Sequence, residues 1–311
     1  MKFFIAQIPK KHLLFFGKIL GNLLYYLPIP QRRIVNRNLK FVYAKSSPKQ
    51  IQRQTKHIFQ HFGISILELL QMTCFSQKDV LANLHVEGKE ILFEALSRKK
   101  GVVLISAHLG NYEMAWQFVP CYLGQPITGV AKKFQNAWID RLTHNIRTRF
   151  GNRIIYKKGA LPDMVQTLRR GEIVGILMDI SRRFEGVEVN FFGHKATATP
   201  AAALLGLRCK SPIIPGFCHR DAKGRLIVQV EPPVEIRRTN DLRSDLQTNT
   251  QLITDRVESA IRNYPEQWNW MLKRWKEFYP GLYPESDRRQ KQIKKKKRRR
   301  GLRNSRRSLR N

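Results

Sequence analysis

Short runs rich in β-branched residues alternate with stretches of helical length from residue 102 onward. The β-rich runs lie at 102–106, 126–130, 153–156, 173–178, 187–191, 212–218 and 226–230. Helical stretches lie between most of them, at 111–122, 136–150, 160–170 and 200–208, and two more follow near 241–263 and 266–277. Strands that alternate with helices pair in parallel, and the helices cover the faces of the sheet. The sequence therefore predicts an α/β fold with a mostly parallel sheet flanked by helices.

A helical region precedes the first of these strands. Residues 12–27 are the most apolar stretch, yet Lys11, Lys18 and Asn22 fall on one helical side. The opposite side carries the apolar residues Leu13, Phe16, Leu20, Leu23, Leu24 and Leu27. This pattern predicts an amphipathic helix that lies in a membrane interface. A single membrane pass is one alternative, although it needs about 20 uninterrupted apolar residues, and packing on the protein's own core is the other.

The remaining chain divides by composition. Between residues 31 and 72, apolar residues recur at helical spacing and predict two more helices, broken near Ser46, Ser47 and Pro48. After Asp287 the chain is of low complexity and includes KKKKRRR at 294–300. We therefore expect a membrane-anchoring helix (1–30), a globular domain (31–287) and a disordered basic tail (288–311).

Positive charge is concentrated at the two ends of the chain. The formal net charge is +34, from 57 Lys and Arg against 23 Asp and Glu. Residues 1–67 hold twelve Lys or Arg and no acid, and the residues after Asp287 hold fourteen and no acid. The middle of the chain is only mildly basic. Both ends should seek a polyanion, either an anionic membrane or nucleic acid.

The four cysteines (Cys74, Cys121, Cys209 and Cys218) are scattered and form no metal-ligand spacing. They predict buried free thiols in a reducing compartment rather than a disulfide framework. The tryptophans at 268, 270 and 275 predict packing in the core or at a membrane interface.

The sharpest local feature is SAHLGNYE at 106–113, which follows an apolar strand and precedes a helical stretch. Strand ends of this kind are where α/β proteins place their sites. With His108 in the loop and Glu113 in the first helical turn, the carboxylate could hold one imidazole nitrogen and leave the other free to take a proton from a hydroxyl. Asn111 is a plausible helix cap, and Gly110 eases the turn. The alternative is that His108 is only structural.

HLGNYE is an H-x4-E motif, and it resembles the H-x4-D/E motif of glycerolipid and lipid A acyltransferases. The surrounding chain resembles the late acyltransferases of lipid A biosynthesis, the lauroyl and myristoyl type in the lysophospholipid acyltransferase-like superfamily. The resemblance runs from about residue 12 to residue 277. Its blocks are GKILGNLLYYLPIPQRRIVNRNLKFVYAKSS, FGISILELL, DISRRFEGVEVNFFGHKATATPAAALLGLR and PEQWNWMLKRWK, in that order.

The resemblance implies roles for individual residues. His108 matches the general base that deprotonates the acceptor hydroxyl, and Glu113 matches the acid that orients it. Arg147 and Asp179 match further active-site residues, and Arg147 could bind a substrate phosphate bidentately. The alternatives are a solvated helix face for Arg147 and an ion pair with Arg182 or Arg183 for Asp179. Asn111 is a weaker candidate for substrate binding, because capping explains it equally well.

The resemblance further implies a membrane-associated O-acyltransferase on the cytoplasmic face of a bacterial inner membrane, held there as a peripheral or monotopic protein. Acyl carrier protein is the expected donor of the acyl thioester, with acyl-CoA as the alternative. The acceptor is a hydroxyl of a lipid A precursor or related glycolipid, and a lysophospholipid or aminolipid is the alternative. We expect no cofactor and no metal. A polyanion-binding protein with nucleic acid as its ligand is the rival from another class, and it leaves HLGNYE without a purpose.

Overall fold

The computed structural model describes residues 8–131, 133–156, 159–182 and 186–284, so the predicted tail at 288–311 lies outside the described residues. A seven-stranded sheet forms the centre, in the order β1-β9-β8-β2-β5-β3-β4. Neighbouring strands are parallel except for β8 and β9, which are antiparallel. The strands are β1 (Leu84–Glu87), β2 (Val102–Ser106), β3 (Ile127–Ala131), β4 (Arg153–Tyr156), β5 (Ile173–Leu177), β8 (Ile213–Arg220) and β9 (Leu226–Val230). The predicted α/β fold with a mostly parallel sheet is confirmed.

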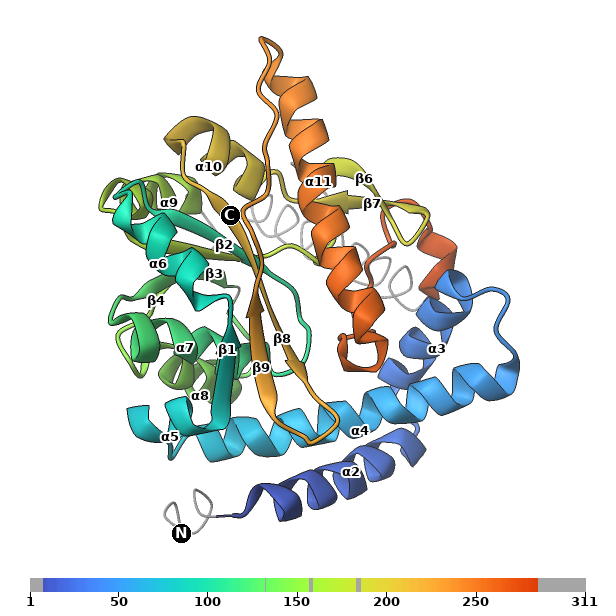
Figure 1. Cartoon of the computed structure of the whole chain (residues 1–311). Coiled ribbons are helices and arrows are strands. Elements are labelled where there is room, and N and C mark those ends of the chain that lie inside the picture. Colours follow the sequence, from blue (N-terminus) through green and yellow to red (C-terminus); the bar gives the residue numbers. More distant parts are fainter. Residues whose placement is uncertain (1–7, 132, 157–158, 183–185, 285–311) are drawn as a thin grey trace, which may run out of the picture.

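Helices cover both faces of this sheet, and the long α4 runs across one edge of the domain with α2 beside it (Figure 1). The helices are α2 (Lys10–Tyr26), α3 (Pro30–Val42), α4 (Pro48–Met72), α5 (Gln77–Asn83), α6 (Lys89–Ser97), α7 (Tyr112–Leu123), α8 (Ala137–Thr148), α9 (Ala160–Arg169), α10 (Ala201–Cys209) and α11 (Leu242–Asn263). The predicted break before α4 is confirmed. There Ser47 and Gln50 form a capping box, and Pro48 occupies the first turn.

Two apolar clusters occupy the two faces of the sheet. Successive side chains of a strand point to opposite faces, so Val103 and Ile105 of β2 join the cluster under α9, α10 and α11. Val102 and Leu104 join the other cluster, under α5, α6 and α7. β2 contributes to both clusters and lies in the middle of the sheet, between β8 and β5. The C-terminal end of β2 is therefore held rigidly from both sides.

The predicted strand at 187–191 forms outside the main sheet. It is β6 (Val187–Phe191), which pairs with β7 (His194–Ala198) in a separate antiparallel hairpin. The helix predicted near 266–277 is wrong. Those residues form a short 3₁₀ turn (Pro265–Gln267) followed by irregular turns. The side chain of Asn38 in α3 donates hydrogen bonds to the carbonyls of Trp270 and Leu272, at 2.7 and 2.9 Å. These carbonyls therefore bind α3 and not the N–H groups of a helix within the segment.

The N-terminal helix packs on the protein along one side. Leu13, Gly17, Gly21 and Tyr25 are buried against α4. A Cβ on Gly21 would overlap the backbone of Phe59, so the two helices touch backbone to backbone there. Packing on the protein's own structure, the alternative raised from the sequence, thus describes one side of α2.

The other side of α2 is exposed and apolar, but it is rotated from the predicted one. Its exposed residues, which we call the α2 apolar face, are Phe15, Phe16, Ile19, Leu23, Tyr26 and Leu27. Leu13 was predicted to face lipid and is buried, and Leu20 and Leu24 are half-buried. Within the described ranges no single helix has the length and hydropathy of a membrane span, whereas α2 and α3, bent by 91°, meet that test as a pair.

Candidate active site

The loop between β2 and α7 is pinned by the segment around residue 268. The backbone N–H of Gly110 donates to the carbonyl of Gln267, and the N–H of Asn269 donates to the carbonyl of His108, both at 3.0 Å. Gly110 has φ of +56°, and a Cβ there would meet the carbonyl of Cys218. A glycine is therefore required at this turn. The result is a fixed platform for the side chain of His108 at the end of β2.

His108 is paired with Asp179, which follows the neighbouring strand β5. Nδ1 of His108 lies 2.8 Å from Oδ1 of Asp179, and the other oxygen, Oδ2, accepts hydrogen bonds from the His108 N–H and from Nε1 of Trp268, each at 2.8 Å. Asp179 is fully buried and His108 has 13% of its side chain exposed. Three hydrogen bonds satisfy the carboxylate, which leaves Nε2 of His108 as the ring nitrogen that can meet a substrate.

His108 and Asp179 shift each other's pKa in opposite directions. Burial on its own lowers the pKa of His108, but the charge and hydrogen bond of Asp179 outweigh it and raise that pKa above its usual value. Burial likewise works to raise the pKa of Asp179, and the charge and hydrogen bonds of His108 and Trp268 bring it below its usual value. Asp179 is therefore ionised when His108 titrates, and a carboxylate in this position fixes the proton on Nδ1.

Glu113 does not hold His108, contrary to the prediction. Its carboxylate forms a bidentate ion pair with Arg147 of α8, with Nε to Oε2 at 3.0 Å and Nη2 to Oε1 at 2.5 Å. The reason lies in helix packing. Trp116 and Gln117 of α7 donate hydrogen bonds to the last carbonyls of α8, those of residues 147 and 146, and this contact brings Glu113 opposite Arg147 while Asp179 occupies Nδ1 of His108.

The two alternatives for Arg147 and Asp179 are also resolved by these contacts. Arg147 lies in no solvated helix face, because its guanidinium group is paired and only 19% exposed. Asp179 binds His108 and Trp268 instead of Arg182, while Arg183 lies outside the described residues. Both pairs act on the same imidazole, since the Glu113 charge raises the pKa of His108 and the Arg147 charge lowers it.

Asn111 caps α7, as the sequence suggested, and it has a second contact. Its Oδ1 accepts from the N–H of Met114 at 3.0 Å, and its Nδ2 donates to Glu68 of α4 at 2.8 Å. The same Glu68 oxygen accepts from Arg220 of β8 at 2.7 Å, and both partners of this ion pair are buried. Both ends of the Asn111 amide are thus bonded within the protein. Through Glu68, the loop between β2 and α7 is bonded to α4, the helix on which α2 packs.

Sequence reasoning missed Trp268, Glu68 and Arg220. Glu68 is the first acidic residue of the chain and interrupts the apolar block FGISILELL. A charge among buried helical positions must find a partner, and that was the available signal. Trp268 is 1% exposed, and the sequence carried no mark of its bond to Asp179.

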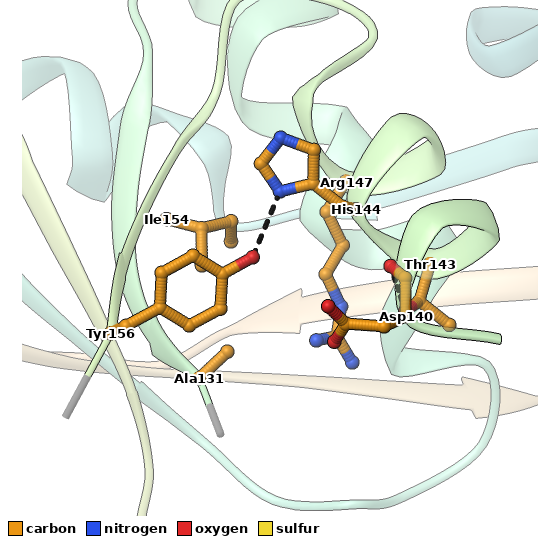
Figure 2. Close-up of a pocket in the computed structure, with 7 residues that line it drawn as sticks. All are labelled: Ala131, Asp140, Thr143, His144, Arg147, Ile154 and Tyr156. Atoms are coloured by element: carbon orange, nitrogen blue, oxygen red, sulfur yellow. Dashed lines mark hydrogen bonds between the residues drawn. The ribbon is translucent and has the colours of Figure 1, made fainter. Parts of the chain in front are cut away.

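Arg147 also lines a small cavity (Figure 2). Its lining residues come from α8 and the ends of β3 and β4: Ala131, Asp140, Thr143, His144, Arg147, Ile154 and Tyr156. The volume is about 10 Å³, which is room for roughly one water molecule. The Tyr156 hydroxyl lies 3.2 Å from Nδ1 of His144, and the Lys133 ammonium lies 4.9 Å from the Tyr156 ring centre. In the described part of the chain, no three His, Cys, Asp or Glu side chains gather as a metal site would require.

An imidazole with one nitrogen on a buried carboxylate can take a proton from a hydroxyl group through its other nitrogen. Known proteins with similar sequences give the class of enzyme to which this chemistry belongs, because they are acyltransferases. A family model described as bacterial lipid A biosynthesis acyltransferase matches residues 1–277, and the chain belongs to that family.

Individual relatives are distant but match over most of their length. The chain is 24% identical to the lipid A biosynthesis lauroyltransferase of Escherichia coli K12 over 281 residues, which is 88% of each chain. It is 24% identical to the myristoyltransferase of that strain over 251 residues, 78% of this chain and 75% of the relative. A phosphatidylinositol mannoside acyltransferase of Mycobacterium tuberculosis is 24% identical over 194 residues, 61% of this chain and 59% of the relative.

Proposed function

We propose that this acyltransferase moves a fatty acyl chain from an acyl thioester to a hydroxyl of a lipid A precursor or a related glycolipid, with His108 as the general base. The observation that carries this proposal is the pairing of His108 Nδ1 with the buried Asp179, which leaves Nε2 as the ring nitrogen that is not bound to Asp179. The relatives support the substrate class, because those with lipid A or phosphatidylinositol mannoside in their names act on glycolipids.

The reaction follows from this geometry. Nε2 of His108 takes the proton of the acceptor hydroxyl as its oxygen forms a bond to the thioester carbonyl carbon. The tetrahedral intermediate then breaks its C–S bond, and the imidazolium returns the proton to the departing sulfur to give a thiol. Asp179 stabilises the imidazolium between these two transfers. No covalent acyl-enzyme is needed.

The second pair places the Arg147 guanidinium group, with its Glu113 partner, near the imidazole. Glu113 engages Nε and Nη2 of Arg147, so the Nη1 donors remain for a phosphate of the donor or the acceptor. The first N–H groups of α7 lie at a helix N-terminus, where a developing oxyanion is favoured. Arg147 would therefore bind substrate, and Glu113 would hold Arg147 in place.

Membrane attachment is the other part of the proposal. The α2 apolar face exposes six large apolar side chains on one side of one helix, and the residues before Glu68 carry only positive charge. A basic, amphipathic surface of this kind lies at an anionic lipid interface. We infer a peripheral or monotopic protein of the inner membrane, with its active site on the cytoplasmic side where acyl carrier protein and CoA are found.

The test is a reconstituted assay with the full chain in detergent micelles. Acyl-acyl carrier protein and acyl-CoA are compared as donors, each with a lipid A precursor, a phosphoglycolipid, a lysophospholipid and an aminolipid as acceptor. Mass spectrometry of the product should show that an ester forms on the glycolipid. The ester should form faster with acyl-acyl carrier protein than with acyl-CoA. Transfer to the lysophospholipid or aminolipid alone would contradict the proposed acceptor. Salt-sensitive DNA binding without any acyl transfer would contradict the proposed reaction.

A further inference from the structure

The end of α2, α3 and the start of α4 lie near one another in the fold (Figure 1). Their side chains line a groove that does not include His108. Its volume is about 390 Å³. The lining residues are Tyr25, Tyr26, Arg32, Asn36, Lys40, Pro48, Ile51 and Gln52. Two of these are cations, two are amides and none is acidic, so the groove presents hydrogen-bond donors and positive charge over an aromatic and aliphatic floor.

Three polar residues of the groove lie four positions apart on α3 and therefore share one helix face. Arg32 is fixed, because its Nη1 donates to the Tyr25 carbonyl at 2.6 Å and its guanidinium carbon lies 5.4 Å from the Tyr25 ring centre. Asn36 is fixed by a 2.7 Å hydrogen bond with the hydroxyl of Thr55 in α4. Lys40 is exposed at the next turn. The Arg32 and Asn36 side chains are thus held in place before any ligand arrives.

Among the residues that the structure describes, the cations of the groove have no ion-pair partner. The sequence contains no acid before Glu68, and none of the ion pairs among the described residues includes Arg32 or Lys40. Arg32 is half-buried and has used only one of its five N–H donors. An acceptor-only anion would satisfy both cations together, and phosphate has the oxygen geometry that an arginine fork binds bidentately.

We propose that this groove binds the phosphate of an anionic phospholipid headgroup. Tyr26 belongs both to the groove and to the α2 apolar face, so a phosphate in the groove would place the attached acyl chains along exposed apolar side chains. That continuity favours a membrane lipid over free phosphate. The inference rests on the membrane attachment in the proposed function and adds to it a headgroup site that is separate from the catalytic pair.

The test compares two variants of the full chain that lose the same charge. Arg32→Gln/Lys40→Gln removes the cations of the groove, and Arg33→Gln/Lys49→Gln removes two neighbouring cations that do not line it. Binding is measured by co-sedimentation with vesicles of phosphatidylcholine alone and of phosphatidylcholine with phosphatidylglycerol. Each cation near an anionic surface contributes about 1 kcal/mol without any specific site, and the matched variant corrects for this.

On phosphatidylglycerol vesicles, the groove variant should partition about tenfold more weakly than the matched variant, while on phosphatidylcholine alone the two should agree. Equal loss in both variants would overturn the site and leave only diffuse attraction. Binding of inorganic phosphate to the wild type without vesicles, abolished in the groove variant, would identify a soluble anion as the ligand instead. Acyl transfer in micelles of neutral detergent is followed in parallel and should be the same in both variants. Failure of the proposed acyl transfer can therefore be told apart from failure of the proposed headgroup site.

Discussion

Oδ1 of Asp179 lies 2.8 Å from Nδ1 of His108, although 71 residues separate them in the chain. The sheet makes this contact, because β2 and β5 are parallel neighbours and end side by side. Asp179 is therefore the partner of His108, and Glu113 is the partner of Arg147. Two carboxylates that the motif and the strand pattern placed in one site have separate tasks.

We expect His108→Ala to remove nearly all acyl transfer and Asp179→Asn to lower kcat by a factor of about 10²–10⁴, because the imidazole loses the group that fixes its tautomer and stabilises its charge. The double variant should lose little more than His108→Ala, since the two residues act as one unit. Rates are measured with saturating donor, and circular dichroism checks the fold. Wild-type turnover in folded Asp179→Asn protein would contradict the assigned role.

The pH dependence of kcat/KM should reflect the raised pKa of His108. A general base must be neutral, so activity should rise with pH through an acid limb that lies above the ordinary histidine value of about 6.5. In Asp179→Asn the carboxylate no longer raises this pKa and burial still lowers it, so the limb should move to lower pH. A limb that stays in place in the variant would assign it to another group.

Glu113 and Arg147 should behave as a coupled pair. Glu113→Ala and Arg147→Ala should each lower kcat/KM, and the double variant should lose less than the two losses combined, with a coupling energy of about 0.5–3 kcal/mol. Arg147→Lys should not restore activity, because an ammonium group cannot bind a carboxylate and a phosphate through one planar fork. Strict additivity of the two alanine variants would show that the ion pair has no part in the reaction.

The buried pair of Glu68 and Arg220 should be important for stability. Glu68→Ala leaves Arg220 buried without a counterion, which we expect to lower the free energy of unfolding by about 3–5 kcal/mol. Glu94→Ala is the matched control, because the Glu94–Arg98 pair is largely exposed and such pairs contribute roughly 0–1 kcal/mol. Urea denaturation of both variants measures the difference. Similar losses in the two would show that Arg220 finds another partner.

The two sides of α2 should respond oppositely to an added charge. Leu23→Asp changes the exposed side and should weaken membrane binding without loss of stability, because a buried leucine at the acyl boundary contributes about 1.5–3 kcal/mol. Leu13→Asp changes the side that packs on α4 and should destabilise the fold. Membrane fractionation at high salt and thermal unfolding separate the two effects. If Leu23→Asp protein unfolds as readily as Leu13→Asp, α2 is a core helix and not an anchor.

The sequence predicted the fold well where local pattern and tertiary packing agree. The parallel strands and the break at Pro48 followed from alternation and from a capping sequence, both of which are local. The segment at 266–277 was predicted as a helix, but its backbone carbonyls are bound by Asn38, which is more than two hundred residues away. Local pattern carries no trace of such a bond.

The site was predicted in its members but not in its pairing. His108, Glu113, Arg147 and Asp179 all meet within one region, as expected from strand ends and from the family motif. Which carboxylate binds which cation depends on the angle between α7 and α8 and on the register of β2 against β5. The predicted orientation of α2 was wrong for a similar reason. Gly17 and Gly21 contribute little to an amphipathic pattern, and yet they define the side that packs on α4.

The close backbone packing of α2 on α4 has a consequence for how the enzyme meets its acceptor. Gly63 of α4 leaves no room for a side chain between the two helices, and five residues further along α4 Glu68 grips the loop that carries His108. Direct contacts through α4 therefore link His108 to the helix that we propose as the membrane contact. With α2 at a bilayer, as we propose, these contacts would hold His108 at a fixed height above the lipid, and we expect acylation only of a hydroxyl that reaches that height.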